Sequence, residues 1–127
     1  MRLFVLAVGI LHALFMVFEL LPPENPRLLH ILSKKLPKEE GLSDAQLKLV
    51  AAIVQNAGIY NGIIAGGLLW SLFTADRSAA ASVAQVLLVG AGVAGVFGTL
   101  TLKSPLPAIQ GIAGIVGALL VASRGLG

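Results

Sequence analysis

The stretch that decides the fold runs from Leu49 to Phe73 and has the sequence LVAAIVQNAGIYNGIIAGGLLWSLF, without one charged residue. A helix needs about 20 mainly apolar residues to cross the hydrocarbon core of a bilayer. Trp70 lies near the far end of this stretch, where aromatic side chains anchor helices at the membrane surface. Ahead of it, Ser43 and Gln46 have the spacing of a capping box, which predicts a transmembrane helix over residues 44–73.

Three further apolar runs predict helices at about residues 3–21, 79–102 and 105–123. Hydrophobic residues make up 57% of the chain and charged residues 12%, about half the charged share of a soluble domain. Four crossings place roughly 80 residues in the membrane, which leaves little for an extramembrane domain. We therefore predict an all-α membrane protein with a single transmembrane domain over residues 1–127, folded as an antiparallel bundle of four transmembrane helices.

The polar stretch at about residues 22–43 joins the first two predicted helices. Leucines recur there at helical spacing opposite Arg27, Lys34 and Lys35, which favours a short helix lying in the headgroup region. An ordinary solvated loop fits the same residues equally well.

Basic residues predict the orientation of the bundle. Three lie in the segments on the side of the termini and six on the side of the long loop: Arg2, Arg77 and Arg124 against Arg27, Lys34, Lys35, Lys38, Lys48 and Lys103. Because Lys and Arg accumulate on the cytoplasmic side, we expect the long loop in the cytoplasm and both termini outside.

Glycine spacing predicts close helix packing. Gly58, Gly62 and Gly66 lie four residues apart on the second predicted helix, and such small-residue strips let helix backbones approach in lipid. The strip can serve packing within one bundle or, alternatively, a homodimer face. Similar strips occur on the later helices: Gly90, Ala94 and Gly98 on the third, and Gly111, Gly114 and Gly117 on the fourth.

The composition excludes several kinds of site. The chain has no cysteine and only two histidines, and no carboxylates cluster at metal-ligand spacing. The glycines form no phosphate-binding loop, and a net charge of +3 does not indicate nucleic acid. We expect neither metal nor cofactor, and the expected partners are membrane lipid and a lipophilic small molecule.

Polar side chains inside the apolar runs are the candidates for function, since ionisable groups at membrane depth are costly and usually face the bundle interior. His12 and Glu19 lie seven residues apart, so they share one helix face about 10 Å apart along the axis. With the amides and the phenol of the later helices they could converge in one cavity in the cytoplasmic half. The alternative is hydrogen bonding that only holds helices together. The later polar residues are Asn56, Tyr60, Asn61 and Gln110.

Several motifs are shared with a known family: His12 with Glu19, Asn56-Ala-Gly-Ile-Tyr-Asn-Gly62 with Ala65-Gly-Gly-Leu68, Ala94-Gly-Val-Phe-Gly-Thr99, and Gln110. Over nearly its whole length the chain resembles the family called domain of unknown function 1304, small four-helix membrane proteins found mainly in bacteria. The resemblance implies a bacterial inner-membrane location. The chain departs from the family pattern in its long polar loop, at Ala57, where the family usually has Gln, and at Ile112-Ala113, where it often has Pro-Ala. It therefore resembles a divergent member.

Three functions fit these observations. The first is an enzyme that isomerises, cyclises or opens an epoxide of a lipophilic molecule by acid–base chemistry. The others are a proton-linked carrier acting as an oligomer and a non-catalytic accessory subunit. His and Glu on one face favour the enzyme, because amides and hydroxyls alone would suffice to hold helices together. The predicted site residues are Glu19, His12 and Tyr60 as catalytic groups, and Asn56, Asn61, Gln110 and Trp70 as substrate-binding groups.

Overall fold

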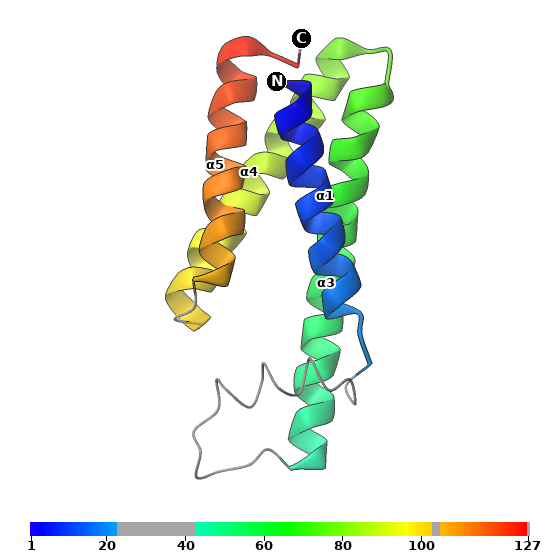
Figure 1. Cartoon of the computed structure of the whole chain (residues 1–127), viewed down its shortest axis with the longest axis vertical. Coiled ribbons are helices and arrows are strands. Elements are labelled where there is room, and N and C mark those ends of the chain that lie inside the picture. Colours follow the sequence, from blue (N-terminus) through cyan, green and yellow to red (C-terminus); the bar gives the residue numbers. More distant parts are fainter. Residues whose placement is uncertain (23–42, 103–104, 127) are drawn as a thin grey trace.

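The computed structural model describes residues 1–22, 43–102 and 105–126. Within these ranges the chain forms four helices, all joined in antiparallel order (Figure 1). They are α1 (Arg2–Glu19), α3 (Asp44–Phe73), α4 (Arg77–Leu102) and α5 (Leu106–Arg124). Each is long and apolar enough to cross a membrane. The predicted four-helix transmembrane bundle is thus confirmed, while the predicted short helix in the first loop lies outside the described residues.

Local hydrogen bonds explain where the helices begin. Ser43 and Gln46 form the predicted capping box, with Gln46 N–H donating to Ser43 Oγ over 3.3 Å and Ser43 N–H donating to Gln46 Oε1 over 2.9 Å. α4 begins two residues before the predicted position 79. Asp76 accounts for the difference, because its Oδ1 accepts hydrogen bonds from the N–H groups of Ser78 and Ala79, both at 3.0 Å.

The end of α1 also differs from the prediction, which placed it at Leu21. The N–H of Leu20 still bonds to the carbonyl of Met16, but the N–H of Leu21 bonds to Phe18, three residues back. A proline follows at position 22. Because the residue before a proline is disfavoured in helical conformation, α1 closes with a tight turn and ends at Glu19.

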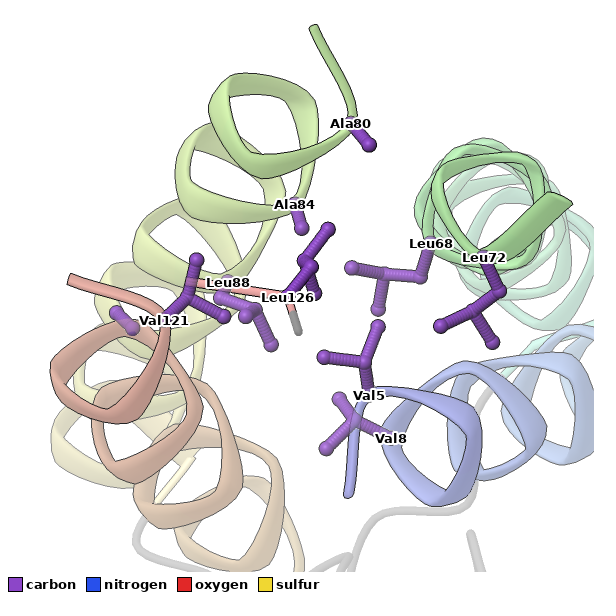
Figure 2. Packing of buried hydrophobic residues seen from close by; sticks show 10 residues of the cluster. Val5, Val8, Leu68, Leu72, Ala80, Ala84, Leu88, Val121 and Leu126 are labelled. Atoms are coloured by element: carbon purple, nitrogen blue, oxygen red, sulfur yellow. The ribbon is translucent and has the colours of Figure 1, made fainter. Parts of the chain in front are cut away.

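The helices are arranged as two pairs, α1 with α3 and α4 with α5. Figure 1 shows the two pairs together near the chain termini and apart toward the opposite end of the bundle. The hydrophobic core lies where the pairs meet, and Figure 2 shows its side chains converging from all four helices and the C-terminal segment. Its members are Val5, Val8, Leu68, Leu72, Ala80, Ala84, Leu88, Ala118, Val121 and Leu126.

Glycines bring α4 and α5 into backbone contact. A Cβ added to Gly95 would lie 2.2 Å from the nitrogen of Gly111, and one added to Gly114 would lie 2.4 Å from the nitrogen of Gly92. The glycine strip predicted on α5 (Gly111, Gly114 and Gly117) therefore does pack against α4. On α4 only the last member of the expected strip packs against α5, since a Cβ on Gly98 would lie 3.0 Å from Cβ of Pro107. Gly90 and Ala94 are exposed, and Gly92 and Gly95 make the backbone contacts instead.

The α1/α3 pair also uses glycine, but against side chains. A Cβ on Gly58 would lie 3.1 Å from Cβ of Glu19, and one on Gly62 would lie 2.6 Å from Sδ of Met16. Nothing lies within 4 Å of a Cβ on Gly66. Packing within the bundle thus accounts for Gly58 and Gly62, and a homodimer through the three glycines stays a prediction.

Candidate functional site

The face that α3 buries follows a heptad spacing, with steps of three and four residues. Its buried members are Ala51, Gly58, Asn61, Ala65, Leu68 and Leu72. Ser71 is also buried, next to this row, and its Oγ donates to the carbonyl of Leu68 within α3 itself. Asn61 is the polar member of this row and is 7% exposed. A single amide in an otherwise apolar seam is typical of residues that fix the register of two helices.

The antiparallel register places Asn61 between His12 and Glu19. Gly9 on α1 lies beside Leu68 of α3, and Gly58 lies beside Glu19. Asn61 therefore falls between the levels of His12 and Glu19, which lie about 10 Å apart along α1. Its two-ended amide can reach both.

The three side chains form a continuous hydrogen-bonded chain. Asn61 Nδ2 donates to Glu19 Oε2 over 2.6 Å, and Asn61 Oδ1 lies 2.7 Å from His12 Nδ1. We name this set the His12–Asn61–Glu19 chain. It joins two residues that the sequence placed on one face but too far apart to bond, and it joins them through the neighbouring helix.

The chemistry of the amide fixes the direction of the bonds. A carboxylate only accepts, so the NH₂ group of Asn61 faces Glu19 and its carbonyl oxygen faces His12. A carbonyl oxygen also only accepts, so His12 donates from Nδ1. In the neutral ring, Nε2 then carries no proton and presents a lone pair.

Nε2 of His12 is buried and has no hydrogen-bond partner in the described part of the chain. The whole residue is 0% exposed, and the ring of Phe15 packs edge-on at 6.3 Å between ring centroids. An unpartnered polar atom in a buried position is unusual in proteins. Here it is a basic nitrogen whose orientation is set by Asn61.

The other predicted site residues do not join this chain. Asn56 is exposed and Tyr60 is 61% exposed, both on the outer side of α3. Trp70 is 48% exposed near the end of α3, as expected for a surface anchor. Gln110 is partly buried on α5 and has no hydrogen bond within the described residues. The structure thus brings together three of the seven candidates, His12, Asn61 and Glu19.

A lipid-facing groove on the α4/α5 pair is a separate feature. It has a volume of about 580 Å³ and an almost wholly apolar lining, apart from Gln85. The amide oxygen of Gln85 is buried without a hydrogen-bond partner in the described chain. Gln85 was not among the predicted site residues. It is the single amide in α4, and a lone amide in an apolar helix could have marked it as a candidate.

In the described part of the chain, no group of three or more His, Cys, Asp or Glu side chains is placed to hold a metal ion. The polar atoms of the His12–Asn61–Glu19 chain are engaged with one another, apart from Nε2 of His12 and the second carboxylate oxygen of Glu19. The chemistry that this arrangement can supply by itself is proton transfer at one imidazole nitrogen.

Of the three comparisons with known proteins, one found a match. No curated protein and no solved structure matches the chain. Residues 6–122 match the family described as "Protein of unknown function (DUF1304)". The match spans α3 and α4 completely, nearly all of α5, and α1 from Leu6 onward, and it includes His12, Glu19 and Asn61. The chain belongs to this family.

Proposed function

We propose that the chain binds a lipophilic small molecule within the membrane and performs cofactor-independent acid–base chemistry on it, with Nε2 of His12 as the proton acceptor. The observation that carries this proposal is the unpartnered, buried Nε2 at the end of an oriented hydrogen-bonded chain. A positioned histidine of this kind is the commonest general base in enzymes.

Asn61 and Glu19 are positioning residues in this scheme. Asn61 holds the Nδ1–H tautomer of His12, which keeps the lone pair on Nε2. Glu19 accepts from Nδ2 of Asn61 and so fixes the orientation of the amide that holds His12. Tyr60 lies on the outer face of α3 and has no role in this step.

Two features favour acid–base chemistry over the other functions. An amide passes protons poorly, so an Asn between His12 and Glu19 suits orientation better than the proton conduction that a carrier needs. A purely structural contact would leave no basic nitrogen unpaired, because burying one without a partner is unfavourable.

His12 is closed off in the described state, so the substrate must reach it through a movement of the helices. The two helix pairs meet at the end near the termini and lie apart at the Glu19 end (Figure 1). We place the movement at the Glu19 end, because the hydrophobic core that holds the pairs together lies at the other end.

Proton exchange into a lipid mixture tests the proposal without a known substrate. The full chain in lipid nanodiscs is incubated in D₂O with a membrane-lipid extract, and mass spectrometry follows deuterium at carbon. We expect exchange that depends on the protein and falls by about 100-fold or more in His12→Gln, the lower end of what a general base contributes. Glutamine can still hydrogen-bond to Asn61, so the helix contact is kept while the base is lost.

The outward-facing Leu14, which is 63% exposed on the same helix, provides the matched control as Leu14→Ala. The positioning role is read by ¹⁵N NMR of histidine, with His30→Gln to assign the second histidine. We expect the Nδ1–H tautomer for His12, and loss of that preference in a folded Asn61→Leu. No protein-dependent exchange, or full exchange in His12→Gln, would refute the proposal.

The finer details of location are part of the same proposal. The excess of basic residues in and beside the first and third loops supports a cytoplasmic position for those loops and external termini. A bacterial inner membrane is the location that the family resemblance of the sequence implies. Single cysteines, introduced at Arg124 and Lys48 of this cysteine-free chain, would report the orientation through labelling by a membrane-impermeant reagent.

A further inference from the structure

The groove on the outer side of α4 and α5 is long as well as voluminous. It follows α4 from Gln85 to Leu100, and a second hollow of about 190 Å³ continues along the same helices, sharing Val96, Leu100 and Ile115. Fifteen residues of helix span about 22 Å. Half of a typical bilayer core is about 15 Å thick, so the groove is longer than one leaflet is deep.

Glycine packing explains why a groove forms here. Gly92 and Gly95 press against Gly111 and Gly114, so the two backbones approach while the larger side chains on either side stand apart. Gly92, Val93 and Ile115 are among the residues that line the hollow between them. Its volume lies within the range of small-molecule sites in proteins, about 300–1,000 Å³.

Gln85 gives the groove its chemical character. Its amide oxygen is buried and unpartnered in the described chain, eight residues from the beginning of α4 at Arg77. That corresponds to a depth of about 12 Å along the helix. Phospholipid acyl chains carry no hydrogen-bond donor at such depth, so ordinary membrane lipid can fill the groove but cannot satisfy this oxygen.

We propose that the groove is a binding site for an elongated apolar molecule that carries one hydroxyl group, and that the Gln85 side chain turns into the groove so that this hydroxyl donates to its Oε1. The apolar body lies along Val89, Val93 and Val96 toward Leu100. The site is on the α4/α5 pair and does not use the His12–Asn61–Glu19 chain, so it stands independently of the proposed chemistry at His12.

The test compares two probes of the same shape. Geranylgeraniol is an elongated isoprenoid alcohol, and its methyl ether lacks the hydrogen-bond donor. Binding of each to the full chain in phospholipid nanodiscs is measured by competition with radiolabelled geranylgeraniol. We expect the alcohol to bind about three- to tenfold more tightly than the ether, the contribution of one buried hydrogen bond.

Variants then locate the contact. Gln85→Leu should abolish the preference for the alcohol while the ether still binds, whereas the neighbouring Val86→Leu, at a 70% exposed position outside the groove, should keep it. Val93→Trp should weaken both probes by filling the groove. The proposal is overturned if wild-type protein binds neither probe, if it binds them equally, or if Gln85→Leu keeps the preference. A dimer whose formation excludes the probe, seen by native mass spectrometry, would also overturn it.

Discussion

Between α4 and α5, glycines on both helices bring the two backbones into contact. Between α1 and α3, by contrast, the helices meet through side chains, among them the hydrogen-bonded His12–Asn61–Glu19 chain. In the first pair the packed atoms are apolar or backbone atoms. In the second pair, Asn61 makes two side-chain hydrogen bonds between the helices, and the guanidinium of Arg2 donates to the carbonyl of Leu72 near the termini. The same bundle thus uses van der Waals packing on one side and side-chain hydrogen bonds on the other, the two forces that associate helices in lipid.

The difference has a consequence for function. A backbone-to-backbone contact tolerates almost no displacement, because its atoms already lie at the limit of approach. A contact made by side chains can open and close by rotamer changes at smaller cost. It is the α1/α3 pair that carries the buried His12, and this suits the proposed site, which would have to admit its substrate from the membrane.

The largest effect should come from a methyl group placed in the α4/α5 contact. In Gly95→Ala the added Cβ would lie 2.2 Å from the nitrogen and 2.3 Å from Cα of Gly111, both backbone atoms that cannot turn away. We expect a loss of about 3 kcal/mol, the upper range for overpacked sites. The free energy of unfolding is measured by titration with SDS. Unfolding is followed by energy transfer between dyes attached to cysteines at two exposed positions, Ser78→Cys and Ser123→Cys.

Gly90→Ala is the matched control, since nothing lies within 4 Å of its added Cβ. Its unfolding midpoint should stay within about 0.5 kcal/mol of the wild type, as for surface substitutions generally. If Gly95→Ala were as stable as Gly90→Ala, the backbone contact between α4 and α5 would not exist in the membrane.

A smaller loss should follow from removal of the amide in the α1/α3 pair. Asn61→Leu leaves Nδ1 of His12 and the carboxylate of Glu19 without their shared partner. We expect a loss of about 1–2 kcal/mol, since hydrogen bonds between membrane helices contribute less than about 2 kcal/mol each. The same SDS titration measures this loss of unfolding free energy, with the two dyes attached to α1 and α3 instead.

Asn56→Leu gives the comparison on the same helix. Asn56 is exposed and has no hydrogen bond in the described chain, so its replacement should leave stability unchanged or slightly raise it. Equal losses in Asn56→Leu and Asn61→Leu would show that the His12–Asn61–Glu19 chain does not hold α1 to α3.

The fold was accessible from the sequence because long apolar runs have few alternatives in a bilayer. Backbone groups must be satisfied inside each segment, so a run such as 49–73 can only be a helix. The capping box at Ser43 was also predictable, since its bonds are local. The beginning of α4 was missed because Asp76 was assigned to a turn, although Asp is a preferred capping residue.

The site was accessible only in part. The seven-residue spacing placed His12 and Glu19 on one face, but the rotation of α3 decides which of its amides meets them. Asn56 and Asn61 differ by about 140° around the helix axis, and only the buried heptad row of α3 shows that Asn61 faces inward. Similarly, the predicted strip of Gly90, Ala94 and Gly98 gave the right residue type on α4, but only Gly98 packs against α5. The backbone contacts are made by Gly92 and Gly95, which the four-residue spacing did not include.

The smallest effect should come from the capping box, and it should stay local. Among the described side chains of residues 43–57, Ala51 alone is buried, so the first turns of α3 have little tertiary packing to support them. Ser43→Ala removes the acceptor for Gln46 N–H, and we expect a local loss of about 1 kcal/mol in the first turn. Hydrogen exchange of the backbone amides of residues 46–48 should become about fivefold faster, while the SDS midpoint stays unchanged.

Ser123→Ala is the control, because its Oγ only donates to the carbonyl of Leu120 and caps no N–H group. A fall in the SDS midpoint as large as that of Asn61→Leu would contradict this prediction, because it would mean that the beginning of α3 is packed into the bundle.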